Sequence, residues 1–409
     1  MKPLFFLAFA REEVELSDMP SSYRLYAGGY EGKIVQLEFD SDKAPADRLC
    51  VTGQFECGEA PTWLTFSQDG KTMWSADEWG KENGTLTTLH VGEEDGLWPC
   101  HSSLLTSTNP RQILTANYKG ANVHCIQVGK DGELDARTAK VVSMDKTGSS
   151  LGPVGWRQEQ AHPHGAHPDP TGAFVVVPDL GTDDLRILRV DTVSGAVSED
   201  KIVHMQPGDG PRHVLFGLLR SKGVDGRKET RLYVMNELDN SLSVVGVTYP
   251  AAGSSSVLPD FKVLQQRVSL LPPRPFPHQQ NFDSWHSAEL VLSPCGHFLL
   301  ASNRAEAHDP AAGTREGPDD LVAVLQIDSD GLLVEASRRL VSSGGRAPRH
   351  MSFSSESIRQ PYKAGTPAYL AVAAHDSDEV IIFEFSSQGA LTEVARIRDV
   401  GRPGIVLWA

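Results

Sequence analysis

A two-strand pattern that recurs along the chain constrains its fold more than any other feature. Each copy holds an apolar strand, a turn built on Ser or Asp and Gly, and a second apolar strand that ends in a polar residue. The copies occupy residues 23–30 (second strand only), 61–79, 111–118 (shortened), 162–181, 211–238, 286–304 and 348–375. Repeats at spacings of tens of residues are typical of arrays in which neighbouring units share one core.

The ends of the second strands set the number of units. They fall at Tyr30, Glu78, Tyr118, Asp179, Glu237, Arg304 and His375, and further strand-like runs follow them. We therefore predict four-stranded units in an all-β, seven-bladed β-propeller. Because 23–30 supplies only a second strand, we expect the ring to be closed by an N-terminal strand that completes the last blade. A pair of β-sandwiches would not explain the repeat.

The repeats account for most of the chain as one domain, predicted at residues 23–409, after an N-terminal extension at 1–22. The irregular stretches at about 250–285 and 306–318 lie between strands, so we expect rim loops rather than linkers. The start, MKPLFFLAFA, has a Lys and a short apolar run, but acidic residues follow at once. A cytoplasmic protein is the prediction, and a cleaved signal is the alternative.

Charge and cysteine usage narrow the partners. The formal net charge is −15, which argues against nucleic acid or an anionic membrane surface as a partner. No run of 18 apolar residues predicts a membrane span. Five cysteines are scattered without a Cys-x-x-Cys pair, which favours reduced thiols. An anionic small molecule would have to be held by a local cluster of basic side chains.

Unusual polar residues gather at two points of the repeat. They are His164, Arg212, His286 and Arg349 at the starts of first strands, and Glu237 and Arg304 at the ends of second strands. Equivalent positions of a propeller converge around the central channel, so these are candidate site residues. Because neighbouring strands alternate in direction, we do not expect both sets to lie at one edge of the ring, and the pattern leaves open which edge binds a ligand.

Three histidines occur close together in AHPHGAHPDP. His162 and His164 are two apart and would share a face of a strand, as zinc ligands often do. Pro163 between them and the lack of a clear third ligand argue against a metal. His162 and His167 are expected to be loop or hydrogen-bonding residues. No dinucleotide, phosphate-loop or serine-hydrolase motif is present, so we predict neither a cofactor nor a metal.

Several ordered motifs, spread over roughly residues 23–409, resemble those of a known family. They are HPHGAHPDPTGAFVVVPDLG, GDGPRHVLF, LYVMNEL, LSPCGHFLLASNR and GGRAPRHMSF. Together they are similar to the seven-bladed propeller lactonase family, which includes fungal 3-carboxy-cis,cis-muconate lactonizing enzymes (carboxymuconate cyclases) and propeller-type 6-phosphogluconolactonases. The resemblance implies a cofactor-independent enzyme that forms or opens a lactone of a small carboxylated or phosphorylated substrate.

The resemblance also implies roles for single residues. His164 and Glu237 would handle protons, while Arg212 and Arg304 would clamp the anionic substrate. Arg349 joins them as a substrate-binding candidate because it repeats the position of Arg212. These residue types suit the chemistry, since guanidinium groups bind carboxylate or phosphate and a positioned His or Glu transfers protons.

Two other functions compete with this one. The insertion LLPPRPFPHQQNFDSWH could bring Phe276, Phe282 and Trp285 to the rim, with His286 beside them. An apolar pocket around Trp285 would favour cyclization or isomerization, including a pericyclic reaction, of a larger intermediate in fungal secondary metabolism. Inward-pointing arginines would favour the lactone reaction instead. The third alternative is a non-catalytic binding platform.

Overall fold

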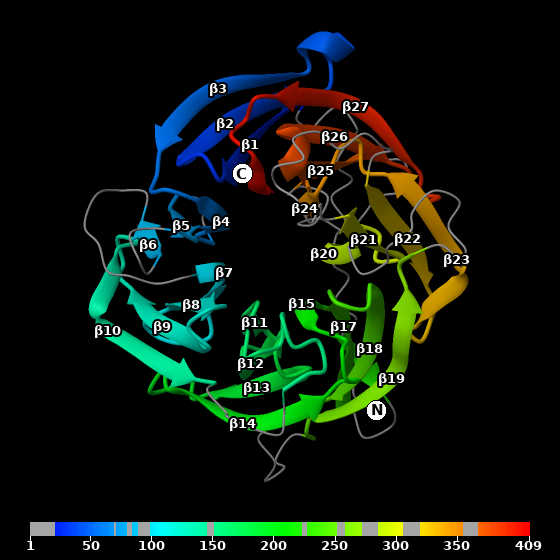
Figure 1. Cartoon of the computed structure of the whole chain (residues 1–409). Helices are drawn as coiled ribbons and strands as arrows, with labels where there is room; N and C mark the ends of the chain where they lie inside the picture. The colour runs from blue at the N-terminus through cyan, green and yellow to red at the C-terminus, as the bar shows by residue number, and fades with distance from the viewer. Residues whose placement is uncertain are drawn as a thin grey trace, which may run out of the picture.

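Seven β-sheets stand around a central axis in the computed structural model (Figure 1). The structure describes residues 21–68, 71–79, 84–88, 99–144, 151–222, 227–251, 258–271, 285–305, 320–354 and 367–409. The predicted all-β, seven-bladed propeller is therefore confirmed. None of the helices within these ranges is long and apolar enough to cross a membrane.

Each blade runs from an innermost strand beside the axis to an outer strand at the rim. The first blade contains β28 (Pro403–Trp408), β1 (Ser22–Gly29), β2 (Lys33–Asp40) and β3 (Leu49–Glu56), with a short 3₁₀ helix, η2 (Pro45–Asp47), before β3. The second contains β4 (Pro61–Phe66), β5 (Met73–Asp77) and β6 (Thr85–Thr88). The third contains β7 (Pro99–Leu105), β8 (Gln112–Asn117), β9 (Asn122–Val128) and β10 (Leu134–Ser143). The fourth contains β11 (His167–Pro168), β12 (Phe174–Asp179), β13 (Asp184–Val190) and β14 (Val197–His204).

The remaining three blades complete the ring. The fifth contains β15 (Pro211–Phe216), β17 (Arg227–Asn236), β18 (Ser241–Thr248) and β19 (Asp260–Ser269), with β16 (Arg220–Lys222) paired to β17. The sixth contains β20 (Trp285–Leu292), β21 (Phe298–Ala305), β22 (Leu321–Ile327) and β23 (Leu333–Ser342). The seventh contains β24 (Pro348–Phe353), β25 (Ala368–Ala374), β26 (Glu379–Phe385) and β27 (Leu391–Arg398), with the 3₁₀ helix η6 (His375–Ser377) after β25.

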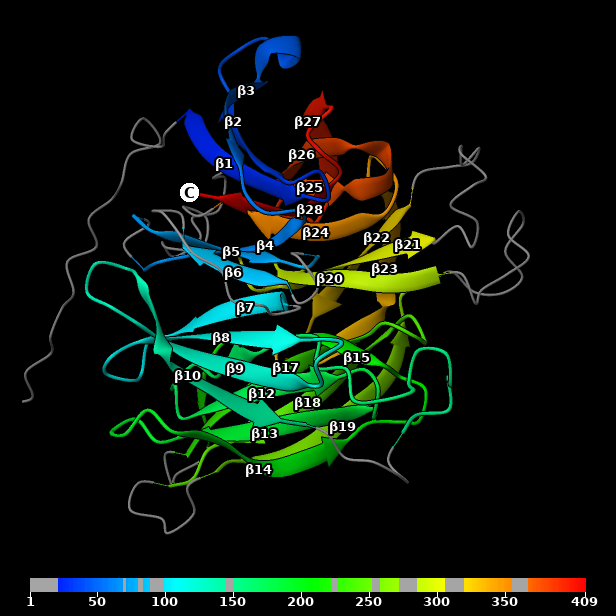
Figure 2. The same cartoon turned by 60° about the vertical axis from the view of Figure 1, so that its left-hand side comes forward.

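The ring closes where the two ends of the fold meet. Strand β1 pairs antiparallel with β28 from Leu25 opposite Trp408 to Gly29 opposite Pro403, and Figure 2 shows the two strands side by side. Closure through the N-terminal strand is thus confirmed. In detail, the mixed blade takes its innermost strand from β28 and its other three from β1–β3.

Burial explains why inner strands and outer strands differ in sequence. Strands β12 and β25 are buried along their whole length, because blades pack against both of their faces, and they read as continuous apolar runs. The outer strand β19 alternates between exposed and half-buried residues over most of its length, as expected at the rim. Apolar clusters fill the spaces between blades; one joins Leu25 and Phe39 of the first blade to Tyr369 and Ile382 of the seventh.

A β-bulge occurs near the start of five innermost strands. In the second blade, Pro61 pairs with Asp77 and Trp63 pairs with Ala76, so Thr62 is the extra residue. The corresponding extra residues elsewhere are Cys100, Arg212, Arg349 and Gly404. We call these five the bulge residues. A bulge re-aims a side chain, and the preceding Pro suits a strand start because it has no N–H for the ladder.

The other two innermost strands keep the same plan with local differences. In the fourth blade Pro163 bridges Asp179, and the next residue, His164, donates its backbone N–H to Pro178. In the sixth blade Ser287 pairs with Asn303, and the register shifts before Leu290. The position equivalent to the bulge residues there is Ala288.

The pairing also shows which ends of the strands share an edge. Pro61 lies opposite Asp77, so the start of β4 meets the end of β5, and Glu78 follows immediately. The expectation that these two sets of ends lie at different edges was wrong. When a strand reverses direction, its end returns to the edge where the preceding strand began.

Candidate active site

A cavity of about 350 Å³ opens at this shared edge of the ring. Its lining consists of the five bulge residues, His164, five residues at the ends of second strands, and three others. They are Thr62, Cys100, Arg212, Arg349 and Gly404; His164; Tyr30, Glu78, Tyr118, Glu237 and Arg304; and Trp63, Trp156 and Arg157. Every blade therefore contributes to one site.

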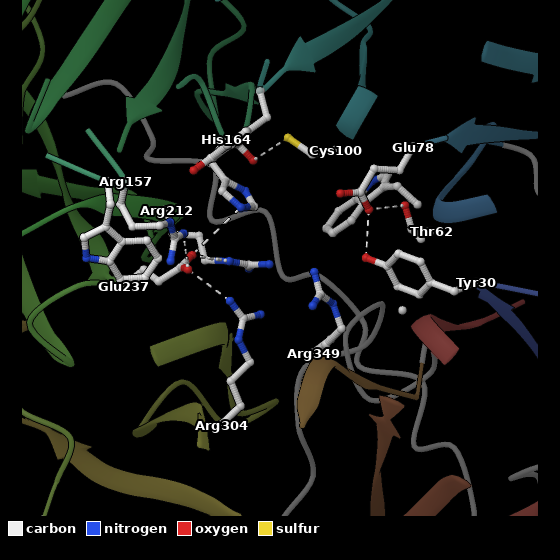
Figure 3. A pocket seen from close by; sticks show the side chains of 14 residues that line it. Tyr30, Thr62, Glu78, Cys100, Arg157, His164, Arg212, Glu237, Arg304 and Arg349 are labelled. Atoms are coloured by element: carbon white, nitrogen blue, oxygen red, sulfur yellow. Dashed lines mark hydrogen bonds and ion pairs between the residues drawn. The ribbon is translucent and has the colours of Figure 1, made fainter. Parts of the chain in front are cut away.

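One wall of the cavity is organised around the carboxylate of Glu237. Its Oε1 lies 2.7 Å from Arg157 Nη2 and 3.0 Å from Arg304 Nη2, and its Oε2 lies 3.0 Å from Arg212 Nε (Figure 3). Glu237 is completely buried. Burial by itself would raise its pKa, but the guanidinium groups of Arg157, Arg304 and Arg212 outweigh that effect and hold the pKa well below its ordinary value.

His164 lies beside this cluster as a neutral imidazole. Its Nε2 is 3.9 Å from Glu237 Oε2, and its side chain is almost fully buried. Burial first, and then the nearby charge of Arg212, lower its pKa well below the usual value for histidine. Burial and the neighbouring Arg304 also lower the pKa of Arg212, to about 10, so this guanidinium stays charged at neutral pH.

The opposite wall carries a second carboxylate in different surroundings. Glu78 Oε2 accepts hydrogen bonds from Tyr30 Oη at 2.8 Å and from Thr62 Oγ1 at 3.2 Å. Arg349 extends over the ring of Tyr30, with 5.4 Å between its Cζ and the ring centroid. Burial raises the pKa of Tyr30, so the phenol keeps its proton and acts as a donor.

One step further along most of the innermost strands, aromatic rings cluster beside the cavity. This histidine layer consists of His101, His167, His213 and His350, together with Trp63 and Glu289. Trp63 of the second blade contacts His213 of the fifth, with ring centroids 5.5 Å apart. Because these blades are not neighbours, the rings must meet near the axis.

Three of the four histidines in this layer are buried, His167 is half-buried, and all four imidazoles are neutral at neutral pH. Burial is the main cause that lowers the pKa of all four histidines, to about 4 for His167. Glu289 lies 3.1 Å from His213 Nδ1 and 3.6 Å from His350 Nε2, and burial raises its pKa. The cavity thus has a charged wall beside a floor whose imidazoles are neutral.

The structure brings together five of the seven residues predicted for the site, namely His164, Arg212, Glu237, Arg304 and Arg349. Trp285 instead packs in an apolar cluster with Leu271 and Ala305. His286 pairs with Arg304 across the sheet but lies two residues before Ala288, the true equivalent of Arg212. The early start of β20 produced this misalignment. Phe276 and Phe282 fall outside the described residues.

The other two histidines of AHPHGAHPDP have separate positions. His162 stacks on Tyr118 with ring centroids 4.1 Å apart, and its backbone N–H bonds to Asp179. His167 belongs to the histidine layer. In the part of the chain that the structure describes, no three His, Cys, Asp or Glu side chains are grouped so that they could hold a metal ion.

Sequence reasoning missed several lining residues. Tyr30, Glu78 and Tyr118 had been located as ends of second strands, so the repeat alone would have placed them beside Glu237. Arg157 is different, because it lies in the segment between β10 and β11, outside the repeat. No periodic signal marks it.

The comparisons with known proteins agree with this architecture. Residues 24–408 match the family model "Lactonase, 7-bladed beta-propeller". The chain belongs to this family. It is 30% identical to the "Probable 6-phosphogluconolactonase" of Arthroderma benhamiae, over 77% of this chain and 74% of that protein. It is 23% identical to the 6-phosphogluconolactonase of Serratia proteamaculans, over 66% of this chain and 70% of the other.

A solved structure extends the comparison to three dimensions. The periplasmic gluconolactonase of Pseudomonas aeruginosa superposes with a TM-score of 0.68 and 23% identity, covering 95% of this chain and 99% of that one. At this identity the likeness shows a shared fold.

Proposed function

We propose that the protein hydrolyses the lactone of a small anionic sugar, with 6-phosphogluconolactone as the first candidate. The observation that carries this proposal is the charge of the cavity: four arginines face only two carboxylates, in a chain of net charge −15. Such a local excess of guanidinium groups suits a phosphate or carboxylate, which they bind through charge-assisted hydrogen bonds. The names of the relatives support the same substrate class.

The cavity also offers what opening of a lactone requires. Arg304 and Arg349 extend toward its centre, where they would hold the anionic group or the oxyanion that forms when water attacks the carbonyl (Figure 3). A volume of about 350 Å³ lies near the lower end of the roughly 300–1,000 Å³ common for small-molecule sites. Neutral His164 would donate a hydrogen bond to the substrate rather than carry a charge.

The environment of Glu237 changes its proposed task. The sequence assigned it to proton transfer, but a carboxylate paired with three guanidinium groups accepts a proton poorly. We propose that Glu237 instead fixes the positions of Arg157, Arg212 and Arg304. Carboxymuconate cyclization remains a second prediction, because the same arginines suit a polycarboxylate. The apolar-ligand alternative has less support, since the arginines point inward and Trp285 lies elsewhere.

A substrate panel tests the proposal. The purified full chain is assayed with 6-phosphogluconolactone generated in situ, with unphosphorylated gluconolactone, and with 3-carboxymuconate, each against the uncatalysed rate. We expect acceleration of 6-phosphogluconolactone hydrolysis and a higher kcat/KM than for the unphosphorylated lactone. Turnover of 3-carboxymuconate alone would transfer the assignment to cyclization, and turnover of none of the three would overturn it.

A further inference from the structure

The two carboxylates of the cavity differ in what holds them. Glu237 contacts three guanidinium groups, which keep it ionised and a weak base. Both described hydrogen bonds of Glu78 come from neutral hydroxyl groups, those of Tyr30 and Thr62. Among the described residues, no Lys, Arg or His lies within ion-pair distance of Glu78. Of the two carboxylates, Glu237 is held by direct contacts with guanidinium groups, whereas Glu78 is held by two hydroxyl groups.

The geometry of Glu78 also leaves one oxygen available. Tyr30 and Thr62 both bond to Oε2. Figure 3 shows the other oxygen directed toward the open centre of the cavity, across from the arginines around Glu237. The two donors belong to different blades, so the carboxylate is held from two sides. This arrangement fixes a base without occupying its reactive oxygen.

We propose that Glu78 is the general base that activates water for attack on the lactone carbonyl, oriented by Tyr30 and Thr62. This inference rests on the proposed hydrolysis. The water oxygen bonds to the carbonyl carbon while one of its protons moves to Glu78 Oε1, and the carbonyl electrons form an oxyanion that faces the arginines. The ring C–O bond then breaks, its oxygen takes the proton from Glu78, and the carboxylic acid formed releases its remaining proton to solvent.

The substitution Glu78→Gln separates this role from a structural one. Glutamine keeps the size of the side chain and an oxygen that accepts from Tyr30 and Thr62, but it cannot take the proton. We expect kcat to fall about 100- to 10,000-fold, the usual contribution of a general base. KM should change less than about threefold, and the acidic limb of the kcat/KM profile should disappear. Glu78→Asp, which keeps the carboxylate, should retain partial activity and that limb.

Chemical rescue provides a second readout. Glu78→Ala leaves space beside Tyr30, and added formate should restore part of the lost kcat, which a purely structural role would not permit. Full activity of Glu78→Gln with an unchanged acidic limb would overturn the base assignment while leaving hydrolysis intact. A wild-type protein that opens no lactone would overturn both proposals, so the two failures are distinguishable. If Glu78→Gln fails to fold, two other results test the base assignment. They are the acidic limb of the kcat/KM profile in Glu78→Asp and the restoration of kcat by formate in Glu78→Ala.

Discussion

Adjacent residues of the same innermost strands contribute to the cavity wall and to the histidine layer, yet they differ in charge. Arg212 and Arg349 face the cavity, while the next residues, His213 and His350, lie in the floor as neutral rings. The bulge between Pro and His turns one position toward the cavity and leaves the next in the histidine layer. Neutral imidazoles that are mostly buried screen charge poorly, so charges in the cavity act more strongly on any bound anion.

The variant with the largest expected effect removes the carboxylate that balances the positive charge of the cavity wall. Glu237→Gln leaves the buried guanidinium groups of Arg212 and Arg304 without their counter-charge. We expect the free energy of unfolding to fall by about 3–5 kcal/mol, as for other broken buried ion pairs. Urea denaturation followed by circular dichroism measures it. Glu78→Gln is the matched control and should cost less than about 1 kcal/mol; equal losses in the two variants would contradict the distinction between the walls.

Lowering the pH should destabilise the fold through the histidine layer rather than through the charged cavity wall. Because the pKa of His167 is lowered to about 4 in the folded protein, the unfolded chain binds its proton first as the pH falls. This histidine contributes nothing above about pH 6.5, and its protonation destabilises the fold progressively between about 6.5 and 4. The loss at pH 5 is on the order of 2 kcal/mol. His101, His213 and His350 act in the same direction, while the raised pKa of Glu289 opposes them.

Unfolding measured at pH 7 and pH 5 checks this expectation. His167→Gln cannot take the proton, so it should lose less stability than the wild type between the two pH values. An identical loss of stability in both proteins would show that protonation of His167 does not cause the pH dependence.

The smallest expected effect concerns substrate affinity. Arg349→Met removes a cavity guanidinium that is not one of the three paired with Glu237 and that we propose as a partner for the substrate. We expect KM for 6-phosphogluconolactone to rise about 10- to 100-fold, the equivalent of one hydrogen bond to a charged group. KM for the unphosphorylated lactone should change much less. His350→Gln, one residue deeper, is the control; if it raises KM as much as Arg349→Met, the division between wall and floor is wrong.

The repeat made the fold predictable, because every blade must bury its second strand and so repeats the same apolar run. It also located His164, Arg212, Glu237, Arg304 and Arg349, since side chains at equivalent positions converge on one axis. The prediction of two separate edges was wrong, because an antiparallel second strand ends at the edge where the first strand begins.

The errors at single residues have local causes. His286 was aligned with Arg212 because β20 begins before the position equivalent to the bulge residues. The periodicity of the sequence does not reveal this offset. Arg157 comes from a segment outside the repeat, and only tertiary contact with Glu237 reveals it. Glu78 had been located but carried no predicted role, because its surroundings depend on Tyr30 from another blade.

The pairing of β28 with β1 has a consequence for how the protein is made. During synthesis, all strands of the other six blades leave the ribosome before β28 does. Until β28 is in place, the first blade lacks its innermost strand and Gly404 is missing from the cavity lining. The cavity lining can therefore be completed only after β28 has been made, later than every other strand that contributes to it.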